Sequence, residues 1–206
     1  NANRSPDFQS VLHVDVDSQE ALDRIRASVK NRAPSLAVSN LQDENFFAAF
    51  MRGRHQALYR EARGGAGKNY AAASDILRYP LIDAYGGIYM DSDDVLTASI
   101  SGVHLEAAEG DLLLGKAVVV PSLEFRGYGN SLFASHAKNP VLARLSEELA
   151  VRNQAQPVFF ETPPPQVDHS TPVTELLTSQ AMKHYRKTVF ELTGPALFND
   201  VLREQR

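Results

Sequence analysis

The stretch NYAAASDILRYPLIDAYGGIYMDSDDVL, residues 69–96, decides how the rest of this chain is interpreted. Its pattern predicts a helix, a turn at Gly86-Gly87 and a short strand over residues 88–90. Directly after that strand comes a group of three acids, which we call the acid cluster: Asp91, Asp93 and Asp94. Crowded carboxylates repel one another and add nothing to stability, so a divalent cation that neutralises them is the best explanation for the cluster.

The composition is that of an ordinary globular protein. The chain has 206 residues, of which 43% are hydrophobic and 22% are charged, and its formal net charge is -4. This charge, with no compensating basic block, argues against a nucleic-acid partner. The absence of cysteine excludes disulfides, zinc-thiolate sites and thiol nucleophiles. We expect no transmembrane segment and no signal peptide, and the polar start NANRSPDFQ indicates a cut within a longer chain.

The first forty residues predict a strand, a helix and a second strand. The apolar run over 10–15 indicates a buried strand, and Asp17 with Glu20 resembles a capping box for a helix that ends near Asn31. Residues 36–38 predict the second strand. This spacing is typical of a βαβ unit, so the predicted fold class is α/β, with a mainly parallel, Rossmann-like sheet flanked by helices.

The remaining pattern predicts more helices and short strands. Helices are expected over 45–61, from residue 69 with a kink or a new turn at Pro80, and over 140–152, 174–192 and 195–203. Strands are expected over 95–100, over 112–120 with a bulge at Gly115, and over 130–135. Residues 154–171, which include three consecutive prolines, predict a long surface loop. No internal repeat or domain boundary is visible, which favours one domain.

The sequence RGGAGK over residues 63–68 is similar to a phosphate-binding loop but departs from that motif. The motif requires glycine where Ala62 stands and Ser or Thr where Asn69 stands, and it follows a strand rather than a helix. A flexible connection is therefore the better interpretation.

By chemistry alone, the acid cluster indicates a cation held beside phosphate. In an extended segment the Cα atoms of residues two apart lie roughly 6.5 Å from each other, so a turn over residues 92–94 would help the carboxylates of Asp91 and Asp93 to converge. One or two carboxylates completed by waters and phosphate suit Mg²⁺ or Mn²⁺, whereas Val95 and Leu96 stand where a calcium loop needs an acid and a glycine. The alternative without function is a solvated turn after an edge strand.

Two enzyme classes place an Asp-x-Asp after a strand. In phosphotransferases of the haloacid-dehalogenase type the first Asp is a nucleophile and the second a general acid. In glycosyltransferases of the GT-A type the acids hold a metal against the diphosphate of a nucleotide sugar. The local residues fit both classes.

The wider block resembles the DXD-containing sugar-binding region of one glycosyltransferase group of the GT-A type. The similarity rests on residues 73–78 (ASDILR), 85–89 (YGGIY) and Asp91-x-Asp93, and continues more weakly through 130–140 and 193–195. The group includes the large clostridial glucosylating toxins, related bacterial effector and toxin glycosyltransferases such as the Photorhabdus toxin domain, and mannosyltransferases of the yeast initiating type. The doubled acid Asp93-Asp94 favours the toxin and effector branch.

The resemblance implies a metal role for the acid cluster. Asp93 would bind Mn²⁺ or Mg²⁺ directly, and Asp91 would bind it through water while touching the donor ribose. Asp94 is the third candidate metal residue.

The resemblance also implies which residues meet the donor. Asp75 and Arg78 are the catalytic candidates: Asp75 would accept hydrogen bonds from donor-sugar hydroxyls, and Arg78 would neutralise the departing diphosphate. Tyr89, which is more suited to packing than to reaction, and Asn130 are further candidates for the donor site.

The implied reaction is transfer of a hexose or N-acetylhexosamine, with retention at the anomeric carbon, from UDP-glucose or UDP-N-acetylglucosamine to an acceptor. A toxin or effector would modify a host protein side chain, and would be secreted or translocated into the host cell, with the bacterial cytoplasm as the alternative. Two other functions stay open: a haloacid-dehalogenase-type phosphatase that uses Asp91 and Asp93, and a non-catalytic module that binds nucleotide sugar.

One departure from the family concerns the base of the nucleotide. The family has an apolar first strand with an aromatic residue that helps to hold the base, whereas this chain has no Trp and its residues 10–15 match the second strand better. We therefore expect a single glycosyltransferase domain over 1–206 that lacks the first strand or is cut from a longer chain, or that holds the base differently.

Overall fold

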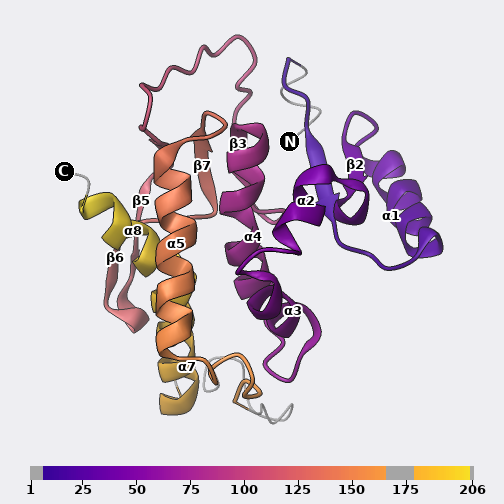
Figure 1. Cartoon of the computed structure of the whole chain (residues 1–206). Helices are drawn as coiled ribbons and strands as arrows, with labels where there is room; N and C mark the ends of the chain where they lie inside the picture. The colour runs from indigo at the N-terminus through magenta and orange to yellow at the C-terminus, as the bar shows by residue number, and fades with distance from the viewer. Residues whose placement is uncertain (1–6, 166–178, 205–206) are drawn as a thin grey trace. The chain divides into compact units, whose positions relative to one another are not determined.

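The computed structural model describes residues 7–165 and 179–204. The chain forms two compact units. The first contains Asn1–Arg52 and Met90–Glu106, and the second contains Gly53–Tyr89 and Ala107–Arg206. Figure 1 labels most of the helices and strands of both units.

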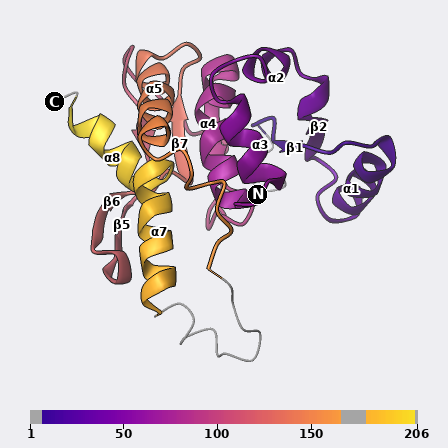
Figure 2. The same ribbon diagram turned by 60° about the horizontal axis from the view of Figure 1, so that its bottom comes forward.

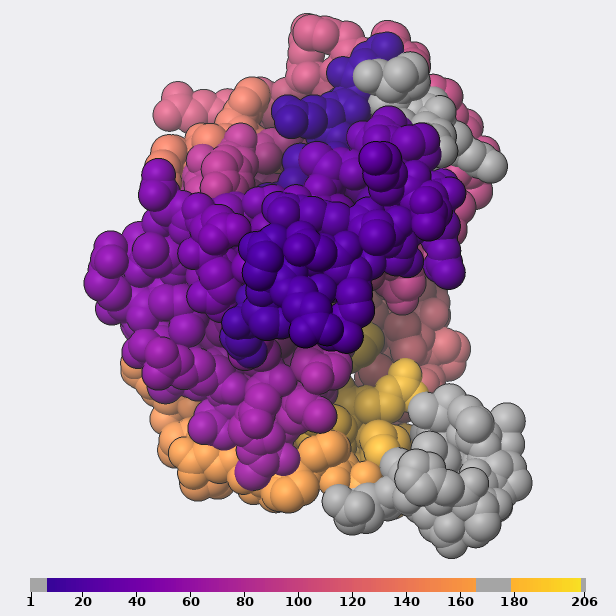
Figure 3. All heavy atoms as spheres, turned by 90° about the vertical axis from the view of Figure 1, so that its right-hand side faces the viewer, coloured from indigo at the N-terminus to yellow at the C-terminus, as the bar shows by residue number. Residues whose placement is uncertain are grey.

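The first unit is built on two parallel strands and the helix between them in sequence. β1 (Val11–Val14) pairs in parallel with β2 (Ala37–Asn40), and α1 (Gln19–Arg32) connects them, which confirms the predicted order. The cap is not Asp17, as predicted, but Ser18, whose side chain accepts a hydrogen bond from the Ala21 N–H. Figure 3 shows the face of this unit on which α1 lies exposed.

The helix predicted over 45–61 is two helices. A short 3-10 helix, η2 (Leu41–Asp43), leads into α2 (Asn45–Phe50), whereas α3 (Gln56–Gly64) begins after a turn that contains Gly53. Glycine in a helix interior loses more conformational entropy than any other residue, so the apolar pattern across it does not continue as one helix. The first unit ends and the second begins at this turn.

The strand predicted over 95–100 is not formed. Residues 91–112 contain turns and bends but no helix or strand. Local hydrogen bonds compete here with sheet pairing: Ser99 Oγ accepts from the Ser101 N–H at 3.0 Å.

The second unit contains two small sheets. The first has the strand order β3-β7-β4, with β3 (Gly87–Met90), β7 (Leu132–Ser135) and β4 (Leu113–Leu114), and β4 runs antiparallel to β7. The second is an antiparallel hairpin of β5 (Ala117–Val120) and β6 (Phe125–Tyr128), joined by the 3-10 helix η3 (Pro121–Leu123).

The large, mainly parallel sheet of the prediction is therefore replaced by a mixed α/β arrangement of small sheets. Parallel neighbours need long crossover connections, whereas the short η3 turn allows only antiparallel pairing. The single strand predicted over 112–120 divides at Gly115, whose N–H still bonds to Leu132 before the chain leaves for the other sheet.

Four further helices belong to the described part of the second unit: α4 (Tyr70–Tyr85), α5 (Pro140–Ala155), α7 (Gln180–Leu192) and α8 (Pro195–Arg203). α5 packs against α4 and α8, and its leucines at 142, 145 and 149 are buried with Leu197 and Phe198 of α8. Pro80 lies within α4 and does not end it. Pro195 begins α8 as predicted.

The predictions for the stretch before α7 fall partly outside the described residues. Residues 156–165 form turns and no helix or strand, as a surface loop would, whereas 166–171 lie outside the described part. α7 begins at Gln180 after its cap Ser179, and residues 174–178 of the predicted helix also lie outside it. Among the described residues, the helices are too short or too polar to span a membrane.

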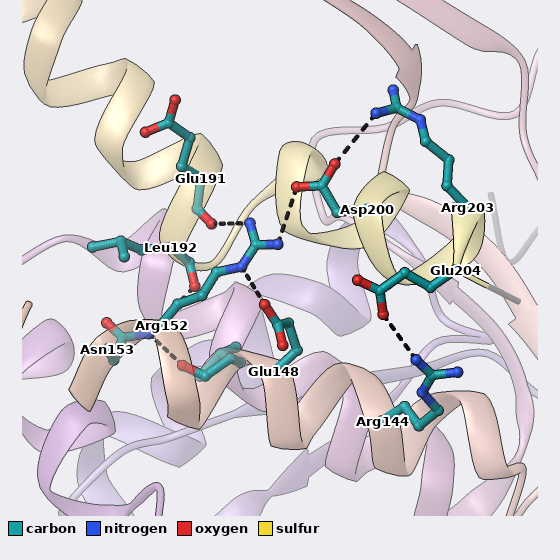
Figure 4. Close-up of polar contacts among 10 residues, drawn as sticks. Arg144, Glu148, Arg152, Asn153, Glu191, Leu192, Asp200, Arg203 and Glu204 are labelled. Atoms are coloured by element: carbon teal, nitrogen blue, oxygen red, sulfur yellow. Dashed lines mark hydrogen bonds and ion pairs between the residues drawn. The ribbon is translucent and has the colours of Figure 1, made fainter. Parts of the chain in front are cut away.

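Arg152 of α5 ties the last two helices to the core (Figure 4). Its guanidinium donates to Glu148 at 2.7 Å, to Asp200 of α8 at 3.0 Å, and to the carbonyl of Glu191 in α7 at 2.8 Å. Burial by itself would lower the pKa of Arg152, but the bonds to the two carboxylates outweigh it and raise that pKa. The permanently charged guanidinium thus fixes α7 and α8 relative to α5.

Candidate functional site

Helix α4 presents Asp75 and Arg78 on one face because they are three residues apart. Arg78 Nη2 lies 2.9 Å from Asp75 Oδ1, and both residues are buried: 3% of the surface of Arg78 and 6% of that of Asp75 are exposed. A buried ion pair is tolerated only when further hydrogen bonds satisfy its remaining donors and acceptors. The hydrogen-bond partners around Asp75 and Arg78 therefore determine how this buried pair is held.

Two residues from distant parts of the chain supply those bonds. The Asn130 side chain donates to Asp75 Oδ1 at 2.9 Å, and the Thr193 hydroxyl donates to Asp75 Oδ2 at 3.0 Å. Arg78 in turn donates to the backbone carbonyl of Asn130. We call these four residues the buried polar cluster: Asp75, Arg78, Asn130 and Thr193. It joins α4, the residue pair after β6, and the turn between α7 and α8.

Tyr89 frames the guanidinium side of this cluster. The centre of its ring lies 4.7 Å from the Arg78 guanidinium carbon, a distance at which a cation is attracted to the ring face. Its hydroxyl lies 2.8 Å from Ser74 Oγ, and its ring stacks on Phe133. Tyr89 therefore orients Arg78 through packing, as expected for an aromatic residue in this position.

Tyr79 contacts the buried polar cluster through Asn130. Its hydroxyl accepts a long hydrogen bond of 3.4 Å from the Asn130 side chain. Burial, as the main cause, raises the pKa of Tyr79 well above its usual range despite the nearby Arg78 cation. The hydroxyl is therefore neutral at physiological pH and adds no charge to the cluster.

The turn from α4 into β3 needs glycine. Gly86 has φ +67°, and a Cβ atom there would lie 2.8 Å from the Ala137 nitrogen. Its N–H caps α4 by bonding to the Ile82 carbonyl at 2.7 Å. Gly86 thus lets the chain leave the helix and enter β3, which runs directly to Asp91.

The acid cluster forms the predicted turn. The Asp94 N–H donates to the Asp91 carbonyl at 3.0 Å, residues 92 and 93 form the turn, and Asp93 is exposed. Within residues 7–165 and 179–204 there is no group of three or more His, Cys, Asp or Glu side chains arranged to hold a metal ion. The carboxylate oxygens nevertheless fit a hard cation such as Mg²⁺ or Mn²⁺, which keeps several waters and is often completed by substrate phosphates.

Four of the predicted site residues thus lie together in the second unit: Asp75, Arg78, Tyr89 and Asn130. The acids Asp91, Asp93 and Asp94 belong to the first unit. Residues 63 and 64 end α3 and residues 65–68 lead on to α4, which agrees with the predicted connection, and a Cβ at Gly67 would overlap the Phe160 carbonyl.

Sequence reasoning did not assign a site role to Thr193 or Tyr79. The signal for Thr193 was weak: residues 193–195 share the family similarity, and a buried threonine stands at the break between two helices. Nothing in the local sequence indicates that its partner is Asp75.

The buried Asp75–Arg78 pair and the acid turn after β3 lie in the stretch whose sequence resembles the DXD-containing region of glycosyltransferases. A family model described as the glycosyltransferase sugar-binding region containing the DXD motif matches residues 6–110, just over half of the chain. The chain belongs to this family. The match includes Asp75, Arg78 and the whole acid cluster.

A solved structure described as "PaToxG Glycosyltransferase" is similar in fold, with a TM-score of 0.71 at 18% sequence identity. The similarity covers 99% of this chain and 60% of that chain, so the present chain spans well under two thirds of that protein's length. A comparison with curated proteins found no match.

Proposed function

We propose that this chain is the donor-binding domain of a metal-dependent, retaining glycosyltransferase, with residues 1–206 acting as one domain. It moves a hexose or N-acetylhexosamine from UDP-glucose or UDP-N-acetylglucosamine to a side chain of a host protein. The observation that carries this proposal is the buried polar cluster, in which a carboxylate and a guanidinium are held in fixed orientations on one helix of a DXD family member.

The chemistry of each group supports a separate role. Asp75 offers carboxylate oxygens, the strongest acceptors for sugar hydroxyls, and Asn130 and Thr193 keep that carboxylate in place. Arg78 carries a permanent positive charge, which stabilises negative charge that develops on a leaving diphosphate. Because the Tyr89 ring and the Asn130 carbonyl already hold the guanidinium, little reorganisation is needed during the reaction.

The acid cluster is the proposed metal site. Asp93 binds Mn²⁺ or Mg²⁺ directly, Asp91 binds it through water and also contacts the ribose, and Asp94 completes the group. When bound, such a cation neutralises phosphate oxygens and promotes departure of the diphosphate. Three acids stand within four residues of the sequence, and the hydrogen bond from the Asp94 N–H to the Asp91 carbonyl turns the chain between the first and the last of them.

The toxin or effector character of the protein, and its secretion or translocation into a host cell, are parts of the same proposal. The support for this part is that a solved structure of similar fold carries the name PaToxG.

Hydrolysis of UDP-glucose and UDP-N-acetylglucosamine, measured with and without Mn²⁺, tests the proposal. We expect Asp91→Asn and Asp93→Asn each to lower turnover by at least about a hundredfold, since each removes a charge that acts on the leaving group. The matched control is Asp43→Asn, which removes an exposed acid of the same unit and should keep wild-type turnover. Undiminished turnover in both acid-cluster variants would rule out the proposed metal site.

Mass spectrometry and calorimetry separate the two alternatives. A phosphatase of the haloacid-dehalogenase type would form a phosphoaspartate at Asp91, which mass spectrometry would detect. A non-catalytic module would bind the nucleotide sugar in calorimetry without hydrolysis or transfer.

A further inference from the structure

The β5–β6 hairpin of the second unit has one covered edge. Asn199 of α8 bonds to both backbone polar groups of Tyr128 in β6: its side chain accepts from the Tyr128 N–H at 2.9 Å and donates to the Tyr128 carbonyl at 2.7 Å. A neighbouring strand would make the same two bonds. α8 also packs along β6, as Figures 1 and 2 show, so the outer edge of β6 is already occupied.

The strand register identifies the groups at the opposite edge. Tyr128 faces Ala117 and Arg126 faces Val119. Directly opposed residues in an antiparallel pair point their N–H and C=O groups either toward each other or both outward. Because those of Tyr128 point away from β5, those of Ala117 and Val119 point away from β6.

This outer edge of β5 is open within the part of the chain that the structure describes. No described residue forms a hydrogen bond with the outward N–H and C=O groups of Ala117 and Val119, and β5 pairs with no strand other than β6. The side chains along it are apolar and exposed: 40% for Val118 and 64% for Val119. Such an edge is a template for another strand.

The two ends of the edge limit its length. Lys116 precedes β5 and Pro121 follows it, and both residue types discourage further strand pairing. The open edge therefore accommodates a short extended segment of about four residues, the length of β5 itself.

One end of β5 lies close to the buried polar cluster. Ala117 is opposite Tyr128, which precedes Asn130 by two residues. An added strand beside Ala117 lies two strand spacings, about 10 Å, from Tyr128, and two residues span at most about 7 Å more, so its end lies within roughly 17 Å of Asn130. All of these residues belong to the second unit.

We propose that the outer edge of β5 binds the acceptor polypeptide as an added strand, through the N–H and C=O groups of Ala117 and Val119. This inference rests on the proposed function, in which the acceptor is a protein. Strand addition draws its affinity from the main chain, so it accepts a range of extended sequences and leads them toward Asn130.

A second copy of this chain fits the edge less well. Stable protein–protein interfaces bury about 1,200–2,000 Å², and one pair of four-residue strands contributes only a small part of that area. A short, weak contact suits a substrate that must leave after reaction.

The test uses Val119→Pro. Proline removes the Val119 N–H, which points away from β6, so the β5–β6 hydrogen bonds remain while strand addition loses one bond. The matched control is Val119→Thr, which keeps both the N–H and the β-branched shape. The probe is a fluorescent synthetic peptide that alternates threonine and valine, and its affinity is measured by anisotropy beside the rate of UDP-sugar hydrolysis.

We expect Val119→Pro to weaken peptide binding about five- to tenfold, as the loss of one hydrogen bond does, and Val119→Thr to change it less than about twofold. Hydrolysis should be equal in all three proteins, because Val119 lies outside the buried polar cluster. Equal peptide binding by the proline variant and the wild type would overturn the inference. Absent hydrolysis in the wild type would instead overturn the proposed function and leave the peptide result to stand by itself.

Two further measurements protect the test. If Val119→Pro does not fold, amide hydrogen exchange of the wild-type protein tests the inference instead. Added peptide should slow the exchange of the Val119 N–H, and an unchanged exchange rate would overturn the inference. Sedimentation of the wild type should show a monomer. A dimer that the proline variant loses, without peptide binding, would assign the edge to a second copy and also overturn the inference.

Discussion

Thr193 Oγ1 donates a hydrogen bond to Asp75 Oδ2 at 3.0 Å, which joins two residues that are 118 positions apart in the sequence. Thr193 is fully buried at the break between α7 and α8, and Asp75 lies in the middle of α4. The C-terminal helices thus contribute directly to the carboxylate that the proposed function requires. Four predictions test this arrangement and the fold around it.

Thr193→Val should destabilise the protein by about 1–3 kcal/mol, because it keeps the shape of the side chain but leaves a buried carboxylate oxygen with one donor fewer. Urea unfolding measures the loss. Thr193→Ser keeps the hydroxyl and is the control; it should retain the bond and lose only the contacts of one methyl group. A valine variant as stable as the wild type would show that the bond contributes nothing.

Arg78→Met should cost about 3–5 kcal/mol, since it leaves the Asp75 charge buried without its partner. Asp75→Asn should restore part of this loss when combined with Arg78→Met, because the orphaned charge is then also removed. A double-mutant cycle in urea gives the coupling free energy.

The comparison pair is Arg24 and Glu20, which are also near neighbours on a helix but are 73% and 81% exposed. Arg24→Met should change stability by no more than about 0.5 kcal/mol. Additive losses in the Asp75–Arg78 cycle would contradict a coupled buried pair.

Gly86→Ala should destabilise the fold by about 1–3 kcal/mol, because alanine is strained at φ +67° and its Cβ would press on the Ala137 nitrogen. Gly64→Ala is the matched control at the end of α3, where nothing lies within 4 Å of the added Cβ, and it should be neutral or slightly stabilising. Thermal unfolding of the two variants, side by side, decides whether the conformation and close packing at position 86, and not the loss of a glycine as such, are the cause.

His55 should make the protein less stable at mildly acidic pH. Burial, and to a smaller degree the neighbouring Arg54, lowers the pKa of His55 below its usual 6.5. As the pH falls, His55 therefore binds a proton in the unfolded chain before it does so in the folded chain. The contribution of neutral His55 to the unfolding free energy is fully present above about pH 6.5 and is lost as the pH falls from there through the lower pKa of the folded state. His55→Gln should flatten this dependence between about pH 7.5 and 5, measured by urea unfolding at each pH.

Arg54→Gln should give a dependence of stability on pH between those of the wild type and His55→Gln, since it removes the smaller cause of the lowered pKa and leaves His55 buried. A His55→Gln protein with the pH dependence of the wild type would assign the acid sensitivity to other groups.

Local patterns predicted well those elements that are bounded by strong signals. α4 begins at its Asn69 cap and ends at Gly86, β3 follows as expected, and α8 starts at Pro195. Each of these boundaries depends on the conformational preferences of one or two residues, which act over a few ångströms and are visible in the sequence.

Elements that depend on distant partners were predicted less well. β6 was not anticipated, because residues 125–128 include a glycine and gain their strand character from β5 and from Asn199. The division of residues 112–120 between two sheets has the same cause: Leu113 and Leu114 pair with β7, whereas Ala117 and the residues after it pair with β6.

The sequence by itself determined the chemistry: a helix that carries Asp75 and Arg78, a glycine turn, and three acids after a strand, which identify the family. Only the tertiary structure decided that Asn130 and Thr193 hold the Asp75 carboxylate, that the sheets are small, and that β5 keeps an open edge. The physical reason is the separation along the chain of the residues that interact. Helix caps, turns and charge clusters arise from neighbours in the chain, whereas buried hydrogen bonds and strand edges depend on which distant segments pack together.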